Sequence, residues 1–185
     1  EGKVSISRAN MATDFPADFT LIAAMNPCPC GHATDANKVC KCSNYSVERY
    51  RSKISGPLLD RIDMHVQVSA IPFIELKSNR KQESSSEIKK RVMRARKIQE
   101  NRCNNSQYIF WNSNLSTEQI KSLCSLPKEA NYLLENAMNQ LKLSARSYHK
   151  ILKVSRTIAD LEGSPSILSN HIAEALHYRC LDRGN

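Results

Sequence analysis

The sequence predicts an α/β segment over residues 1–75, followed by an all-helical domain over residues 87–185. Before residue 75 the apolar residues occur in short alternating or continuous runs, which are typical of strands, whereas after residue 87 they recur with the helical period. The polar stretch at 76–86, rich in serine and lysine, is typical of a linker. The chain has 185 residues and is 41% hydrophobic, which is enough to build a core.

Three strands are expected in the α/β segment. Residues 3–9 alternate apolar and polar side chains, as a half-buried strand does, and residues 19–25 form the continuous apolar run of a fully buried one. The dipeptide Phe15-Pro16 predicts a bend between them. Residues 64–70 alternate again and complete the set.

The second part of the chain carries the start and stop signals of helices. Helices are expected at residues 84–102, 116–126, 127–141, 144–163 and 169–179. Thr117 and Glu118 near a first turn predict a capping box, and Gly163 predicts a helix end. A shorter helical stretch before residue 64 is expected to break at Gly56-Pro57.

The net charge and the number of cysteines indicate which kind of partner the protein binds and in which cellular compartment it works. Lys and Arg outnumber Asp and Glu by 27 to 18, a formal charge of +9, which favours polyanionic partners such as nucleic acid or nucleotide phosphates. The seven cysteines are an odd number and the chain begins without a signal peptide, so we expect a reducing cytoplasm. No apolar run approaches the roughly 20 residues that cross a bilayer, so no membrane contact is expected.

Four of the cysteines lie in a loop that we interpret as an insertion over residues 27–43. They are Cys28, Cys30, Cys40 and Cys42, two C-x-C pairs separated by nine residues. Four thiolates can close a tetrahedral zinc site, although a single intervening residue is tighter than the usual spacing, and His32 is an alternative ligand. A loop of reduced thiols and a redox dithiol stay open as alternatives, and the absence of C-x-x-C weakens the second.

Two polar residues are candidates for work on a phosphate or a water. Asn26 ends the apolar run at 19–25, at the edge where open α/β sheets bind ligands, but Asn-Pro is also a common turn starter. Arg61 is flanked by two acids in "LLDRID". It is either one half of a surface ion pair or an arginine finger presented to a phosphate.

Four stretches of the sequence carry a family resemblance: "VSISRA", "FPADFTLIAAMNPCPCG", "RYRSKISGPLLDRID" and "LSARSYHKILKVSRTIADLEG". Together they resemble the C-terminal half of the magnesium-chelatase-like AAA+ ATPases, specifically the bacterial ComM/YifB group. The resemblance spans nearly the whole chain. It implies that the α/β segment is the C-terminal part of an AAA+ core sheet and that the helical domain is an AAA+ lid.

The resemblance also implies roles for individual residues. Asn26 matches the sensor 1 residue, which positions the hydrolytic water, and Arg61 matches the arginine finger, which acts in trans on the ATP of a neighbouring subunit. Arg146 matches the sensor 2 arginine, which reaches the nucleotide phosphates. Residues 4–19 resemble a hairpin that faces the central pore in related ring motors, so Arg8 is a candidate for DNA contact.

At the level of the whole protein, the resemblance implies a homo-oligomeric ring, expected to be a hexamer, that hydrolyses ATP with Mg²⁺. Its work would be that of a DNA-dependent motor, such as a helicase or branch-migration enzyme in transformation or recombination. Three alternatives stay open: a chelatase-type motor that acts on a protein partner, a zinc-stabilised nucleic-acid-binding module without an ATPase role, and a cysteine redox protein.

Two family motifs are absent from the sequence. There is no G-x-x-x-x-G-K-[ST] and no apolar strand that ends in paired acids, and the chain starts at Glu1 without an initiator methionine. We therefore expect a fragment that alone neither binds nor hydrolyses ATP, whereas the longer parent does both.

A further basic stretch is either a nucleic-acid contact or a solvated helix face. It contains Lys89, Lys90, Arg91, Arg94, Arg96 and Lys97.

Overall fold

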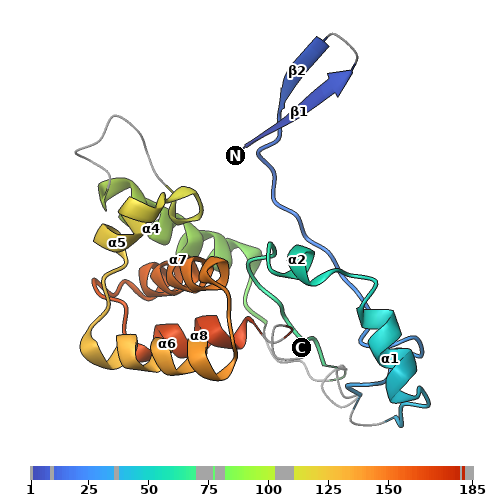
Figure 1. Ribbon diagram of the computed structural model, residues 1–185. Helices are drawn as coiled ribbons and strands as arrows, with labels where there is room; N and C mark the ends of the chain where they lie inside the picture. The colour runs from blue at the N-terminus through green and yellow to red at the C-terminus, as the bar shows by residue number, and fades with distance from the viewer. Residues whose placement is uncertain are drawn as a thin grey trace. The chain divides into compact units, whose positions relative to one another are not determined.

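The structure, a computed structural model, divides into two compact units, Glu1–Arg51 and Ser52–Asn185 (Figure 1). It describes residues 2–8, 11–35, 38–69, 77, 82–102, 111–179 and 181. Residues 52–69, which the sequence assigned to the α/β segment, thus belong to the unit that contains the helical domain. The linker at 76–86 and the domain limits at 75 and 87 stay predictions.

The first unit begins with an antiparallel hairpin. Strand β1 (Lys3–Arg8) pairs with β2 (Met11–Pro16), in a register that places Lys3 opposite Pro16 and Arg8 opposite Met11. The strand predicted at 3–9 is therefore confirmed, but the bend predicted at Phe15-Pro16 is wrong, because both residues lie in β2. Proline is tolerated there because it ends an edge strand, where its missing N–H costs no ladder hydrogen bond.

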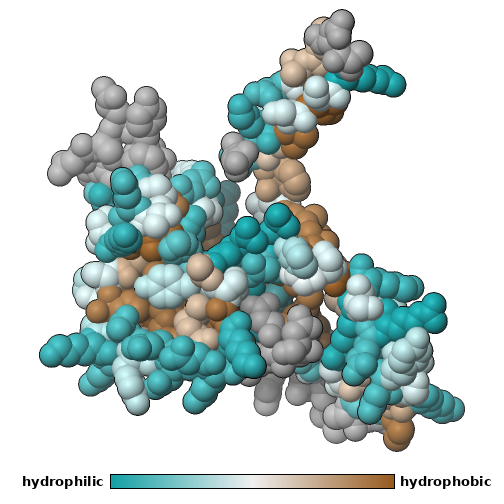
Figure 2. All heavy atoms as spheres, viewed as in Figure 1, coloured by the Kyte–Doolittle hydropathy of each residue, from teal (hydrophilic) through white to brown (hydrophobic). Residues whose placement is uncertain are grey.

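The two other predicted strands are not formed. Residues 17–26 contain no strand, and the apolar side chain of Ile22 is 90% exposed. Residues 64–69 contribute only a single parallel bridge, from His65 to Arg179. A buried strand needs neighbours on both edges, and in the described part of the chain the only sheet is the β1–β2 hairpin. Figure 2 shows the resulting hydrophobic surface along the hairpin and the segment that follows it.

Two short helices flank the boundary between the units. Helix α1 (Asn44–Arg51) follows the cysteine loop, and Ser43 caps it by accepting the Ser46 N–H at 3.2 Å. Helix α2 (Gly56–Leu59) begins at the dipeptide that was expected to break a helix. The helical stretch is interrupted, as predicted, but at residues 52–55, just before Gly56. Pro57 is tolerated in the first turn of α2 because the first N–H groups of a helix have no partner within it.

The helical domain, residues 82–179, contains the remaining helices. They are α4 (Ser85–Arg102), the 3₁₀ turn η1 (Asn112–Asn114), α5 (Thr117–Leu123), α6 (Lys128–Gln140), α7 (Ala145–Glu162) and α8 (Ser169–His177). The capping box of α5 is formed by Ser116 and Gln119, which flank the predicted Thr117 and Glu118. Gly163 ends α7 with φ 77°, a left-handed conformation that glycine adopts without strain.

Helix α7 supplies much of the core of this domain. Its buried residues Ile151, Leu152, Ile158 and Ala159 join Leu134 of α6 and Ile172 of α8 in one apolar cluster. The pattern arises because apolar residues three and four positions apart lie on one face of a helix. Among the described residues, no helix combines the length and the apolar character that a membrane span needs. The small sheet followed by packed helices agrees with an α/β start and a helical continuation.

Candidate functional site

The cysteine loop of the first unit brings four sulfur atoms together. The Sγ atom of Cys28 lies 3.4 Å from that of Cys30 and 3.7 Å from that of Cys40, and Cys30 lies 3.6 Å from Cys40. With Cys42 included, all four sulfurs lie within 4.8 Å of one another. A tight turn makes this possible: the Gly31 N–H donates to the Cys28 carbonyl at 3.0 Å, and Gly31 has φ 80°.

These sulfur separations match a metal site. Four thiolates bound tetrahedrally at a Zn–S distance of about 2.3 Å are spaced about 3.8 Å apart. The three measured distances are close to this value and far longer than the roughly 2.05 Å of a disulfide bond. His32 is not one of the grouped ligands, and its Nδ1 atom lies 3.3 Å from the Asp35 carboxylate. The donor set that fits zinc is therefore the four cysteines.

The thiols of this loop differ in acidity. Backbone N–H groups of His32 and Lys41 donate to the Cys30 sulfur and lower the pKa of that thiol to about 6. A backbone hydrogen bond from Cys42 lowers the pKa of Cys40, but desolvation and the neighbouring thiols outweigh it and raise that pKa to about 12. Without a bound cation, the Cys30 thiol therefore ionises readily, and ionisation of Cys40 is disfavoured. A divalent cation would remove this resistance, because it favours every thiolate it binds.

The loop is joined to helix α1 and to Asn26. The Arg51 Nε atom donates to the Pro27 carbonyl at 3.2 Å, so the end of α1 contacts the residue that follows Asn26. Asn26 itself is exposed and belongs to the first unit. The sequence predicted a water-positioning role for Asn26, and this role stays a prediction.

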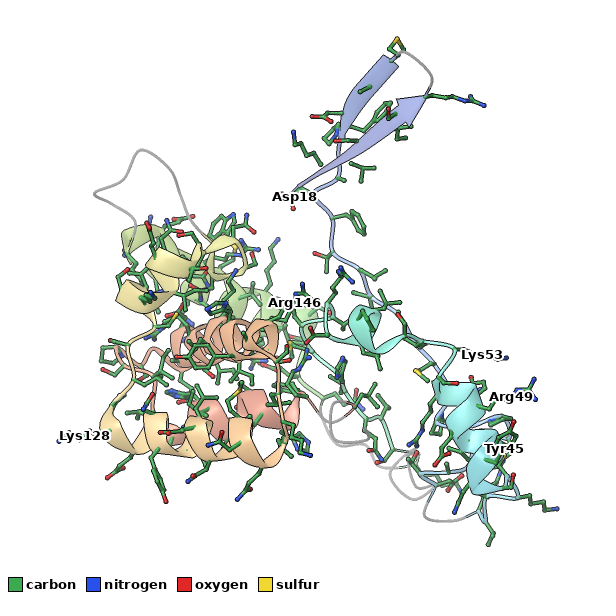
Figure 3. All side chains as sticks on the ribbon, viewed as in Figure 1. Asp18, Tyr45, Arg49, Lys53, Lys128 and Arg146 are labelled. Atoms are coloured by element: carbon green, nitrogen blue, oxygen red, sulfur yellow. The ribbon has the colours of Figure 1, made fainter. Side chains whose placement is uncertain are left out.

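Arg61 and Arg146 lie in the same unit, and Asp60 connects them. Arg146 is in the first turn of α7, with its side chain 53% exposed, and its Nη1 atom lies 3.1 Å from Asp60 Oδ2 (Figure 3). Arg61, the next residue after Asp60, is also exposed, and its Nη1 donates to the Pro57 carbonyl at 3.2 Å. The acid beside Arg61 therefore pairs with Arg146 and not with its own neighbour.

Asp60 accepts further hydrogen bonds from the start of α7. The hydroxyls of Ser144 and Ser147 each donate to Oδ1 at 2.9 Å, and Arg179 Nη2 lies 3.7 Å from the same oxygen. Burial raises the pKa of Asp60, but the hydrogen bonds from Ser147, Ser144 and Arg146 outweigh it and hold the pKa below its ordinary value. The sequence reading missed this role; the acid beside an arginine in "LLDRID" was the one available signal.

The backbone around Arg61 is also tied to the helical domain. Lys150 of α7 donates to the Arg61 carbonyl and pairs with the Asp63 carboxylate at 2.6 Å. The buried Arg179 side chain donates to the Ile62 carbonyl, and the His65 N–H donates to the Tyr178 carbonyl at 2.7 Å. Residues 60–65 are thus held against α7, which carries Arg146, and against the two residues that follow α8.

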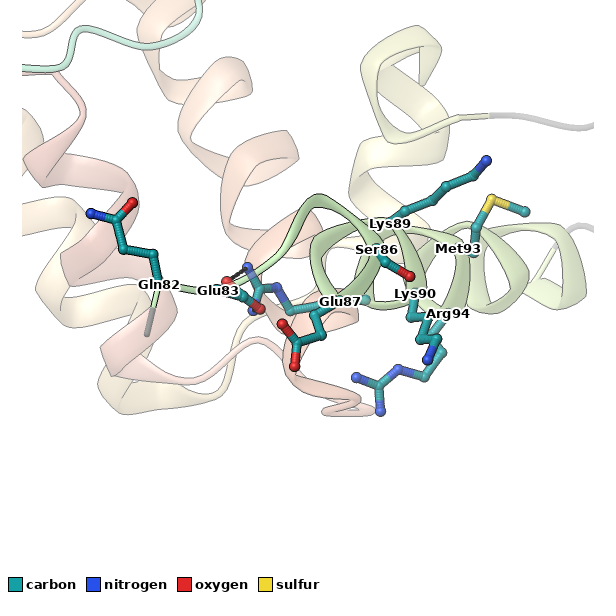
Figure 4. A pocket seen from close by; sticks show the side chains of 9 residues that line it. Gln82, Glu83, Ser86, Glu87, Lys89, Lys90, Met93 and Arg94 are labelled. Carbon is teal, nitrogen blue, oxygen red and sulfur yellow. Dashed lines mark hydrogen bonds and ion pairs between the residues drawn. The ribbon is translucent and has the colours of Figure 1, made fainter. Parts of the chain in front are cut away.

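The two basic regions proposed for nucleic acid differ in structure. On α4, Arg91 pairs with Glu83 at 2.7 Å, Lys97 pairs with Glu100 at 3.2 Å, and the Arg96 guanidinium lies 4.1 Å from the centre of the Trp111 ring. Three of the six basic residues therefore have partners nearby, and Lys89, Lys90 and Arg94 remain as exposed cations on the helix (Figure 4).

Arg8 lies at one end of the hairpin, and the ion pair between Lys3 and Asp14 lies at the other. It is the last residue of β1, exposed, and directly precedes the turn. At the other end, Lys3 pairs with Asp14 at 2.7 Å. In the described part of the hairpin Arg8 is thus the cation at the tip, and its contact with DNA stays a prediction.

Comparison with known proteins agrees with the family resemblance. The family model for magnesium chelatase, subunit ChlI, matches residues 1–76, and the model for its C-terminal region matches residues 82–179. The chain is 42% identical over 183 residues to competence protein ComM of Haemophilus influenzae and 38% identical over 183 residues to YifB of Escherichia coli. Each match covers 98% of this chain but 35% of the relative, so the chain spans about a third of the relatives' length.

Proposed function

The chain belongs to the magnesium chelatase ChlI family, in its ComM/YifB group, and we propose that it supplies the water-positioning and phosphate-facing residues of a ring-forming AAA+ ATPase. The relatives are about three times as long as the chain, so the activity is proposed for the complete gene product that contains it. The observation that carries the proposal is that Arg61 and Arg146 are both exposed and lie in one unit. Lys150 holds the carbonyl of Arg61, and Arg146 belongs to the first turn of α7.

The chemistry suits these residues. Transfer of a phosphoryl group to water needs little covalent catalysis, so the rate depends on positioning and on neutralising charge. Arg61 would reach the ATP of a neighbouring subunit, and Arg146 would contact phosphate oxygens. Arginine suits both roles because its planar fork stays charged and pairs with two oxygens at once. The amide of Asn26 would orient the attacking water. Mg²⁺ would accompany the ATP and neutralise part of its charge.

We propose DNA as the substrate of this motor. The resemblance to the ComM group implies it, the net charge of +9 favours it, and Arg8 at the hairpin tip offers one contact. The competing possibility within the family is a chelatase-type motor that acts on a protein. We expect the ATPase rate of the complete gene product to rise when DNA is added, which a protein-directed motor would not show.

We further propose that Cys28, Cys30, Cys40 and Cys42 bind a structural Zn²⁺. The support is the sulfur spacing and the chemistry of the donor set. A zinc site with all four positions filled by protein ligands has no open position for substrate. Its role would be to stiffen the loop between Asn26 and α1, where Arg51 already joins the two. In this proposal the zinc has a structural role within the ATPase. The alternative, a zinc-binding module without ATPase activity, assigns no catalytic role to Asn26.

The ATPase proposal is tested with Arg61→Ala in the complete gene product. We expect turnover to fall by about 10³-fold or more with ATP binding retained, because an arginine finger contributes about 10³ to 10⁵ in rate. Lys121→Ala, which removes an exposed cation on α5, is the control. Mixing Arg61→Ala subunits with Asn26→Ala subunits should restore part of the activity, because one kind of interface then has both residues intact. Full activity of Arg61→Ala, or no ATPase in the unaltered protein, would refute the proposal.

A further inference from the structure

The start of helix α7 forms an anion site that the chain's own Asp60 fills. Helix α7 is 18 residues long, so its N-terminus carries partial positive charge and free N–H groups. Around it lie the hydroxyls of Ser144 and Ser147, the guanidinium of Arg146 and, at 3.7 Å, that of Arg179. These donors suit any oxyanion, and here they surround the Asp60 carboxylate.

The two oxygens of Asp60 have partners that differ in their exposure to solvent. Oδ1 faces Ser147 and Arg179, which are buried, and Arg179 is 1% exposed. Oδ2 contacts Arg146, whose side chain is half exposed. An ion pair that is open to water contributes little free energy, so Arg146 can exchange Asp60 for another anion at little cost. The hydrogen bonds that Ser144 and the buried Ser147 donate to Oδ1 do not depend on that exchange.

The carboxylate also anchors the segment that carries Arg61. Asp60 is the residue before Arg61, and its Oδ1 hydrogen bonds attach the segment to the first turn of α7. The Lys150 and Arg179 bonds to the next two carbonyls continue the attachment. A change at the start of α7 therefore reaches the backbone of Arg61 through direct hydrogen bonds, without a rearrangement of the core.

Resting on the proposed ATPase function, we propose that Asp60 is a positioning residue with two separable effects. Through Oδ2 it competes with the nucleotide phosphate for Arg146, and through Oδ1 it holds Arg61 in the orientation that the neighbouring subunit requires. Occupation of Arg146 by phosphate leaves the Oδ1 anchor intact. One carboxylate thus contacts the phosphate-facing Arg146 through Oδ2 and holds the segment of Arg61 through Oδ1, and the two roles are independent.

Two substitutions in the complete gene product separate the effects. Asp60→Asn keeps an oxygen that can accept from both serines but removes the charge that attracts Arg146, so the KM for ATP should fall by about two- to fivefold with kcat within about twofold. Ser147→Ala removes a buried donor to Oδ1 and leaves the Arg146 pair, so kcat should fall by about tenfold with KM nearly unchanged. Glu135→Gln on the exposed side of α6 is the control for an acid-to-amide change.

The outcomes are decisive when thermal unfolding shows that each variant is folded. An unchanged or raised KM in Asp60→Asn would overturn the competition, and an unchanged kcat in Ser147→Ala would overturn the anchoring. If the unaltered protein has no ATPase activity, the proposed function fails, and titration of the 185-residue chain with inorganic phosphate still tests the competition. In that titration, the NMR signal of the Arg146 guanidinium should respond at lower phosphate concentration in Asp60→Asn; an equal response in both proteins would contradict the proposal.

Discussion

Asp160 accepts a hydrogen bond from Arg156 Nε at 3.1 Å, one turn earlier in α7, and both side chains are buried. Arg102 at the end of α4 makes a second ion pair with the same carboxylate, and Asn112 donates to it at 2.8 Å. The remaining nitrogens of Arg156 donate to the carbonyls of Ser164 and Pro165. One buried carboxylate therefore joins α4, η1 and α7, and through Arg156 the loop that leads to α8.

We predict that Asp160→Ala lowers the free energy of unfolding of the chain by about 3–5 kcal/mol, because it leaves the buried Arg156 without its carboxylate partner. Urea denaturation followed by circular dichroism measures this. Glu135→Ala, an exposed acid on α6, should change the stability by less than about 0.5 kcal/mol. A loss below 1 kcal/mol in Asp160→Ala would show that the network is not a main source of stability.

For the cysteine loop we predict one zinc per chain in protein purified without chelators. Elemental analysis should give a ratio close to one, and Cys40→Ser should reduce it to a small fraction, because three ligands bind zinc much more weakly than four. Cys124→Ala is the matched control, since Cys124 lies in the core of the helical domain and should leave the zinc content unchanged. A ratio well below one in the unaltered protein would exclude the structural zinc.

The acidity of Cys30 predicts a pH dependence in the metal-free chain. Its pKa of about 6 lies below the ordinary value of 9.0, so the thiolate dominates above pH 6 and is lost as the pH falls through that value. Alkylation by iodoacetamide, mapped by mass spectrometry, should modify Cys30 before Cys40 at pH 7, with a rate that halves near pH 6. Zinc should suppress the reaction. Equal rates for the two cysteines at pH 7 would contradict the assignment.

At the hairpin tip we predict that Arg8→Ala weakens DNA binding by the complete gene product at all sequences alike. A phosphate contact carries no base information, so its loss should also reduce by about one the slope of log affinity against log salt. Fluorescence anisotropy over a salt series measures both effects. Lys3→Ala should do less, because Lys3 is already paired with Asp14. An unchanged slope in Arg8→Ala would remove this residue from the DNA contact.

Sequence reading succeeded where the signal is local. Ser144 was placed at the start of a helix and Gly163 at its end, and α7 has these limits because a cap interacts with groups three or four residues away. The four cysteines were grouped for the same reason: they lie within fifteen residues of one another. Even the errors were small here, such as Thr117 in place of Ser116 at the start of α5.

The predictions of strands at residues 19–25 and 64–70 were wrong because a strand also needs neighbouring strands, which a short stretch of sequence does not reveal. The run that includes Phe19 and Ile22 is apolar enough for a central strand, but a strand is stable only beside other strands. In the described residues the hairpin provides no edge for it. The same limit applies to Asp60. An ion pair between Arg61 and a flanking acid was one of the two interpretations of "LLDRID", whereas Asp60 pairs with Arg146, 86 residues later.

The sequence by itself determined the family, the limits of the main helices, the set of four cysteines and the identity of Arg61 and Arg146 as candidates. Only the tertiary structure decided which carboxylate each cation meets: Asp60 with Arg146, and Asp160 with Arg102, 58 residues away. The physical reason is the distance along the sequence between the interacting residues. Caps and helical periods depend on neighbours a few residues apart, whereas an ion pair between distant residues exists only after the packing of α7 has brought them within about 3 Å.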